Sequence, residues 1–175
     1  MMTVSQQPSH LLRQRTQSCH EAVDAAFGAY DLADGASYSR LLRAHARALI
    51  PAEAALAGWP GLPAWRLRTG LIAADLGALG EAVPDAPPFA LADRAGAWGA
   101  LYVLEGSRLG NAMLVRGLPA GWPNTYMGAR HESGGWRGLL GAIDAEGAAG
   151  GAGWVDAAVA GAEATFALYL AASGG

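Results

Sequence analysis

Apolar residues of this chain fall into six long stretches, which are separated by clusters of proline and glycine. Because alanine and leucine favour helices and proline and glycine interrupt them, each stretch predicts a helical segment. The six segments cover residues 9–27, 37–57, 65–79, 90–118, 136–145 and 154–172. Pro51 predicts a kink or break inside the second segment, and residues 58–63, 119–135 and 147–153 are expected to form turns or irregular structure.

The composition supports an all-α fold. The chain has 40 alanines and 22 leucines but only three isoleucines and five threonines. Strands favour β-branched residues, so their scarcity argues against a sheet. With 52% apolar and 15% charged residues the chain is too apolar for disorder. Its length of 175 residues suits one domain over residues 1–175, with a flexible start at 1–8.

Charge and cysteine content exclude several classes of protein. All 12 basic residues are arginine, 15 residues are acidic, and no basic run is present, which disfavours nucleic acid binding. No uncharged apolar run reaches about 18 residues, so we expect no membrane span. The first ten residues lack the apolar core of a secretory signal, which favours a cytoplasmic location. The single cysteine, Cys19, allows no intrachain disulfide and forms no zinc signature.

The first predicted helix carries a stripe of Arg13, His20 and Phe27, with Thr16 on an overlapping face. Residues seven apart differ by only about 20° around a helix axis, so the three share one side. A histidine among apolar neighbours can serve as a neutral imidazole ligand. Arg13 lies about 10 Å along the axis, where it can meet an anionic group of a flat ligand. The alternative is a helix-face histidine beside a solvated arginine.

The fourth predicted helix contains Gly96, Gly99, Gly106 and Gly110 on one face. Each glycine costs about 1 kcal/mol of helix stability relative to alanine, so a compensating interaction is expected. Three explanations remain open: close approach of the backbone to a flat ligand, close packing of two helices, or a bend at Gly106–Ser107.

Several segments resemble the heme oxygenase family. Residues 12–16 together with 19–21 resemble its proximal helix. Residues 99–110 resemble the distal helix of the bacterial heme oxygenases that accompany bacteriophytochromes. The resemblance extends from about Leu11 to Ala171, with further matching segments at 38–42, 75–80 and 162–166.

The resemblance implies an all-α, multi-helical bundle that holds heme between its first helix and a kinked, glycine-containing distal helix. The implied activity is cleavage of heme to biliverdin, carbon monoxide and iron with O2 and electrons. His20 would be the proximal ligand of the heme iron, and the Ser107 hydroxyl could join the distal proton supply. The heme-binding residues would be His20, Arg13, Thr16, Phe27, Tyr102 and Arg108, and the distal catalytic positions Gly106, Ser107, Gly110 and Asn111.

Heme would then be both the substrate and the oxygen-activating cofactor. An external electron donor, such as a reductase or a ferredoxin, would supply electrons. A bacteriophytochrome would be the acceptor of biliverdin, and the protein would be a monomer or a homodimer.

Two departures from the family pattern leave a second function open. Asn111 follows Gly110 where the family usually has a second glycine, and no arginine or lysine occurs after Arg137. A degenerate, non-catalytic module that binds heme, a bilin or a protein partner fits these departures. A di-iron site is rejected because no acidic residue stands three positions before any of the four histidines. The other histidines, His10, His45 and His131, are expected on the surface or in packing roles.

Overall fold

The computed structural model describes residues 6–175, and every regular element in that range is helical. The all-α prediction is therefore confirmed for the described residues. The elements are α1 (Pro8–Arg15), α2 (Gln17–Gly28), α3 (Gly35–Ala57), α4 (Thr69–Ala78), α5 (Arg94–Leu114), the 3-10 turn η1 (Val115–Gly117), α6 (Gly135–Gly150) and α7 (Trp154–Ser173). Most of the start expected to be flexible, residues 1–5, lies outside the described residues, whereas Pro8 already belongs to α1.

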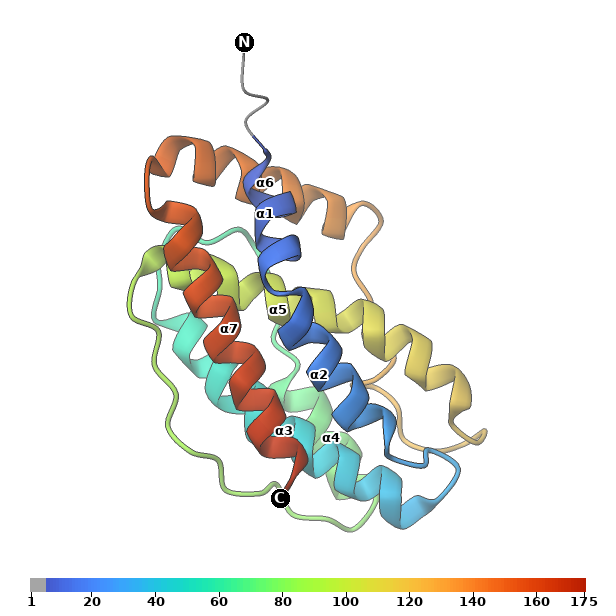
Figure 1. Ribbon diagram of the computed structural model, residues 1–175. Coiled ribbons are helices and arrows are strands. Elements are labelled where there is room, and N and C mark those ends of the chain that lie inside the picture. Colours follow the sequence, from blue (N-terminus) through green and yellow to red (C-terminus); the bar gives the residue numbers. More distant parts are fainter. Residues whose placement is uncertain (1–5) are drawn as a thin grey trace.

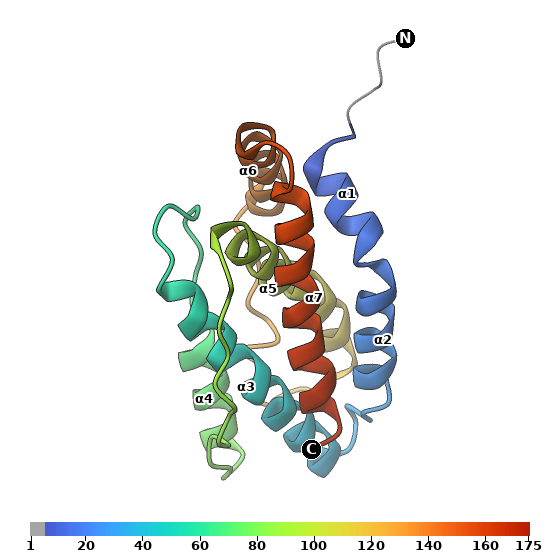
Figure 2. The same cartoon turned by 60° about the vertical axis from the view of Figure 1, so that its left-hand side comes forward.

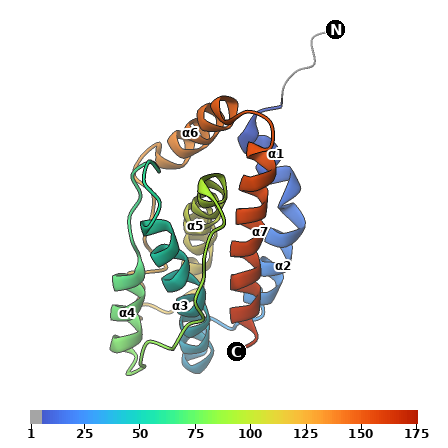
Figure 3. The same cartoon turned by 90° about the vertical axis from the view of Figure 1, so that its left-hand side faces the viewer.

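The helices pack as a bundle around α7 and α5 (Figure 1). Helix α7 contacts α5, α3 and α2, and α3 also packs on α4. Seen from the side, α5 runs between the α3–α4 pair and the α7–α2 pair (Figure 3). Helix α6 lies across one end of the bundle and packs on α1 (Figures 1 and 2). This arrangement places α2 and the second half of α5 on either side of the region described below as the site.

Two glycines let the backbones of α5 and α7 touch. A Cβ atom added to Gly99 would overlap the carbonyl group of Ala158 and lie 2.9 Å from the nitrogen of Ala162. A Cβ atom added to Gly161 would likewise overlap the backbone of Gly96. Close helix packing therefore explains the first two glycines of the α5 stripe. Helix α5 spans Gly106–Ser107, where a bend was one of the three explanations, as part of one helix from Arg94 to Leu114.

Side-chain hydrogen bonds to backbone N–H groups set two helix starts that differ from the prediction. The Glu53 carboxylate accepts hydrogen bonds from the backbone N–H groups of Arg68 and Thr69, at 2.8 and 2.9 Å, so α4 begins at Thr69 instead of residue 65. The Asp93 carboxylate accepts from the backbone N–H of Gly96 at 2.7 Å, so α5 begins at Arg94 instead of residue 90. Both carboxylates accept hydrogen bonds from backbone N–H groups that have no partner within the first turn of a helix.

The predicted first helix is divided in two at Thr16, and the predicted turn at 147–153 is partly wrong. Thr16 leaves the helical region with φ −102° and ψ 5° and donates its hydroxyl to the Leu12 carbonyl at 2.8 Å. Helix α6 continues to Gly150, and Gly151 ends it with a φ of +73°. A glycine with positive φ is a common helix terminator, and here it stands later than the sequence pattern suggests.

Helix α7 meets the length and composition of a membrane-spanning helix. In the bundle, 44% of its most apolar 18-residue window is buried, and it contacts α5, α3 and α2. A core helix of a bundle passes the same test, so this feature is weak support for a membrane span.

Candidate active site

A cavity of about 780 Å³ is lined mainly by α1, α2 and α5, with single contributions from α3 and pairs of residues from α6 and α7. Its volume falls within the range of about 300–1,000 Å³ that is typical of small-molecule sites. Nine of the ten site residues expected from the sequence line it. These are Arg13, Thr16, His20, Phe27, Tyr102, Gly106, Ser107, Gly110 and Asn111.

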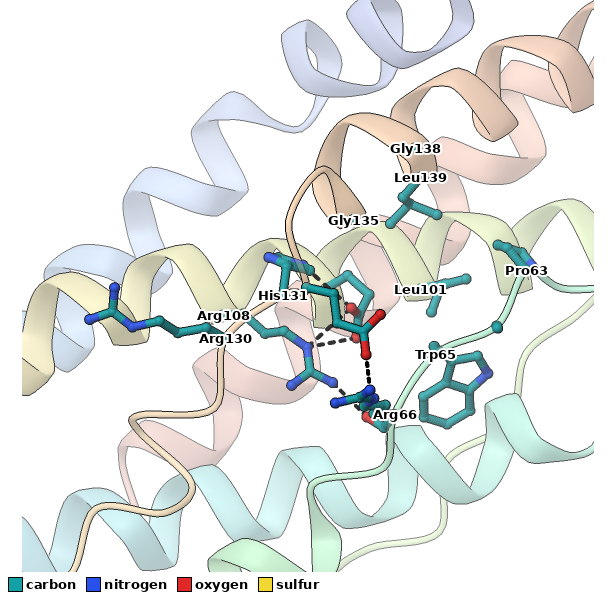
Figure 4. A pocket seen from close by; sticks show the side chains of 13 residues that line it. Pro63, Trp65, Arg66, Leu101, Arg108, Arg130, His131, Gly135, Gly138 and Leu139 are labelled. Carbon is teal, nitrogen blue, oxygen red and sulfur yellow. Dashed lines mark hydrogen bonds and ion pairs between the residues drawn. The ribbon is translucent and has the colours of Figure 1, made fainter.

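Arg108 is the residue that the structure places elsewhere. Its side chain is 4% exposed, and its Nε donates to both carboxylate oxygens of Glu105 at 3.0 and 3.1 Å. Its Nη2 donates to the backbone carbonyl of Arg66 at 2.6 Å. The expectation that Arg108 binds heme therefore differs from the structure, in which Arg108 lines a second, smaller cavity (Figure 4). The sequence predicts that Arg108 lies on this helix. It does not show that the Arg108 side chain pairs with Glu105, three residues earlier, and so does not reach the larger cavity.

His20 presents its imidazole to the cavity from α2. Its side chain is 60% exposed, and its ring centroid lies 5.8 Å from that of Phe166 on α7. Nε2 of His20 is 3.3 Å from Oδ2 of Asp24, one turn further along the helix. Both side chains are exposed, so this contact contributes little to stability and is easily exchanged for another ligand. The accessible ring nitrogen is thus available to a metal centre.

Arg13 is the single arginine among the residues that line this cavity. It lies on α1, beyond the break at Thr16, and its side chain is exposed. The last helix, α7, contributes Phe166 and Tyr169 to the cavity but no cation. An anionic group of a ligand would therefore find its positive partner on α1.

The second half of α5 forms the wall opposite His20. A Cβ atom added to Gly110 would meet nothing within 4 Å, whereas one added to Gly106 would lie 3.3 Å from the ring of Trp136. The Ser107 hydroxyl donates to the Leu104 carbonyl at 2.6 Å and accepts from Nη2 of Arg68 at 3.0 Å. Its hydrogen therefore points into the helix, which does not support the proton-supplying role expected for it.

Asn111 offers a hydrogen-bond donor at the same wall. The residue is 3% exposed, and its Nδ2 has no hydrogen-bond partner among the described residues. Leaving a buried amide unpaired costs about 1–3 kcal/mol, so an acceptor on a ligand in the cavity would recover stability. The Asn111 side chain also approaches the Tyr126 hydroxyl and lowers the pKa of that group, so a ligand in the cavity would share this donor with Tyr126.

His45 lines the inner part of the cavity and is packed among aromatic rings, which is one of the two roles that the sequence suggested. It is 5% exposed, and its Nδ1 lies 2.6 Å from the Tyr126 hydroxyl. Burial lowers the pKa of His45 to about 3, with a smaller contribution from Arg68, so the ring is neutral at pH 7. The helical spacing of apolar residues indicates that His45 is buried. Leu41 and Leu49, four residues before and after it, lie on the same helix face and are fully buried.

Arg68 connects α5 to α3 from an irregular segment in which no sequence signal marks it. It is 1% exposed, and its Nη2 donates to the Leu104 carbonyl at 2.6 Å as well as to Ser107. Its guanidinium carbon lies 5.5 Å from the ring centroid of Tyr126. Burial raises the pKa of Tyr126, and the charge of Arg68 partly offsets that rise. The hydroxyl of Tyr126 therefore stays protonated beside His45.

Comparisons with known proteins agree on one fold. No protein-family model matches the chain. A heme oxygenase of Xanthomonas campestris pv. campestris (strain 8004) is 37% identical over 90 residues, which are 49% of this chain and 54% of that protein. The chain thus matches about half the length of this curated relative.

The structural comparison covers much more of the chain. The NO- and CO-bound heme oxygenase from Neisseria meningitidis superposes with a TM-score of 0.81 over 97% of this chain and 91% of that one, at 21% sequence identity. The helical order described above therefore belongs to a known architecture. We conclude that this chain has the fold of a heme oxygenase.

Proposed function

We propose that the chain is a heme oxygenase, which cleaves heme to biliverdin, carbon monoxide and iron. The observation that carries the proposal is the cavity of about 780 Å³ with the accessible imidazole of His20 on α2 and the open backbone of Gly110 on α5. A flat ligand with a central metal would be held between a nitrogen ligand and a wall that no side chain obstructs. The partial match to a heme oxygenase and the shared fold support the same activity.

Three residues of the cavity would each make a contact with heme. His20 would bind the iron through a ring nitrogen, after Nε2 leaves its contact with Asp24. Arg13 would pair with a carboxylate of the ligand. Asn111 would donate its unpaired Nδ2 to an acceptor held over the α5 wall.

Bound heme supplies the iron at which oxygen is activated, and the chain supplies orientation and a controlled environment. Gly110 would leave room for the ligand at the α5 wall, while Phe27, His45 and Tyr169 line the inner part of the cavity. The neutral His45–Tyr126 pair places polar atoms there without adding a charge. These groups restrict how the flat ligand can rotate.

Electrons would come from an external donor, such as a reductase or a ferredoxin. By the resemblance of residues 99–110, we propose a bacteriophytochrome as the acceptor of biliverdin and a cytoplasmic location.

The test is single-turnover chemistry on the purified chain loaded with one equivalent of hemin. With a reductant and with catalase to remove free peroxide, we expect biliverdin, identified by its absorption and mass, together with carbon monoxide. The Asn111→Leu variant should bind hemin but turn over about tenfold to a hundredfold more slowly, because a preorganised donor is lost. The exposed asparagine Asn124 provides the matched control, and Asn124→Leu should turn over as the wild type does.

Hemin that binds stoichiometrically but yields no bilin would contradict the proposed activity. That result would instead identify the chain as a non-catalytic module of the same fold. An equal rate in the wild type and in Asn111→Leu would contradict the role given to the amide.

A further inference from the structure

The larger cavity has side chains at its edge that come from neither of the helices proposed to face the two sides of heme. His20 on α2 and Gly110 on α5 would face those two sides. Residues on other helices would then meet the outer edge of the flat ligand and limit its rotation in its own plane. Helix α6 contributes two such residues, Trp136 and Leu140.

Trp136 forms a large and well-packed part of this edge. Of the six tryptophans of the chain, all of which lie within residues 6–175, Trp136 alone lines the larger cavity. Its ring centroid lies 5.6 Å from that of Tyr102 and 5.8 Å from that of His131, with interplanar angles of 34° and 41°. These two aromatic neighbours restrict the positions that the indole can adopt.

Gly106 allows the indole to approach the backbone of α5. A Cβ atom added to Gly106 would lie 3.3 Å from Cη2 of Trp136, which is closer than the optimal carbon–carbon separation of about 3.5–4.0 Å. The third glycine of the α5 stripe therefore makes room for an aromatic ring. Gly110, one helical turn later, has no atom within 4 Å of an added Cβ, so the space beside it stays open.

The indole also lies in the part of the cavity that contains the arginine. Burial raises the pKa of Tyr102, and the nearby charge of Arg13 partly offsets that rise. Because Tyr102 packs on Trp136, the arginine, the phenol and the indole belong to one part of the cavity. A ligand whose carboxylate pairs with Arg13 would have the neighbouring part of its outer edge against Trp136.

We propose that Trp136 is a specificity-determining residue, which sets the in-plane orientation of heme and so selects the meso carbon that is cleaved. This inference rests on the proposed function and deepens it. The meso carbons of heme are chemically similar, so an enzyme distinguishes them by how it orients the substrate. A packed indole at one place on the edge excludes the orientations that would bring a bulky substituent of heme to that place.

The test is proton NMR of the purified chain with one equivalent of ferric hemin and cyanide. The number and order of the shifted heme-methyl signals report the in-plane orientations and their populations, and this readout does not require turnover. We expect one predominant orientation in the wild type. In Trp136→Ala the ratio of orientations should change by about twofold to tenfold, which is the range for the loss of one aromatic contact.

Two further variants and a control accompany Trp136→Ala. Trp136→Phe keeps an aromatic ring and should restore most of the wild-type ratio. Gly106→Ala presses a methyl group on the indole without removing it, so it should also change the ratio, and it decides the question if Trp136→Ala does not fold. Trp59 is partly buried and lines neither cavity, so Trp59→Ala should match the wild type.

The biliverdin isomers from a single turnover, separated by chromatography, provide the second readout. We expect one main isomer from the wild type and a larger share of another isomer from Trp136→Ala.

Two results would overturn the inference. The first is an unchanged ratio of orientations in the folded variants Trp136→Ala and Gly106→Ala. The second is a changed ratio of orientations with an unchanged distribution of isomers. A changed ratio without any biliverdin would contradict the proposed activity and still support the role of Trp136 in orienting heme, so the two failures are distinguishable.

Discussion

His45 carries no charge at neutral pH because its imidazole is buried between the bundle helices. Its neighbours are the Phe27 ring, 4.5 Å away between centroids, and the Tyr126 hydroxyl at 2.6 Å from Nδ1. In the unfolded chain the same imidazole would have its ordinary pKa of about 6.5. The folded state therefore resists protonation of His45, and acid favours unfolding.

The sign of this effect follows from the two pKa values. Between pH 6.5 and about 3, the unfolded chain binds a proton at His45 and the folded chain does not. The contribution of His45 to the free energy of unfolding is thus complete above pH 6.5 and falls as the pH is lowered. We expect a loss of up to about 1.4 kcal/mol per pH unit in that window.

Urea unfolding of the wild type and of His45→Gln between pH 7.5 and 4 measures this contribution. Because glutamine does not titrate, the advantage of the wild type over the variant should shrink as the pH falls. Parallel pH curves for wild type and His45→Gln would contradict a buried, neutral His45.

At the scale of the helix, the first half of α5 packs against α7 and its second half lines the cavity. Its first half places Gly99 against the backbone of α7, where no side chain fits. Its second half turns Gly110 toward the cavity, where a side chain would meet no atom within 4 Å. The glycine stripe that the sequence shows as one pattern therefore combines helix packing with access for a ligand.

Alanine substitution of the two glycines should have opposite effects on stability. Gly99→Ala should lower the free energy of unfolding by about 1–3 kcal/mol or more, because its methyl group would overlap Ala158. Gly110→Ala should leave it unchanged or raise it by up to about 1 kcal/mol, since alanine is the better helix former. Urea unfolding of both variants tests the difference, and equal destabilisation would contradict the division of α5.

The sequence identifies the helices of the fold better than their ends. Alternation of apolar stretches with proline and glycine locates every long helix, because that pattern depends on local preference. The starts of α4 and α5 depend on the Glu53 and Asp93 carboxylates. For Glu53, the bonded N–H groups are fifteen or sixteen residues away, which no local pattern shows.

Within the candidate site, the sequence finds residues on a helix face and misses those brought in by tertiary contacts. Arg13, His20 and Phe27 follow a seven-residue spacing and line one cavity. Arg68 comes from a segment without regular structure, so its hydrogen bond to Ser107 follows only from the packed bundle. Arg108 is the opposite case. The sequence includes it among the site residues, but in the structure it pairs with Glu105 and does not line the larger cavity.

At the scale of the molecule, the cavity is lined mainly by the neighbouring helices α1 and α2 and by α5, which is distant from them in sequence. The break at Thr16 divides the first helical segment, so that α1 packs on α6 while α2 packs on α7. Arg13 and His20 thus reach the same cavity from two helices rather than one. Across from them, α5 presents Gly110 and Asn111. These positions fit the flat, anionic, metal-containing ligand that the proposed function requires.

Titration of the purified chain with hemin, followed at the Soret band, tests this account most directly. We expect one equivalent to saturate the wild type, and His20→Ala to lose the spectrum of an imidazole-bound iron. His10→Ala should keep that spectrum, although His10 lines the same cavity. A His20→Ala variant whose Soret spectrum and stoichiometry match those of the wild type would contradict the assignment of His20, and with it the proposed site.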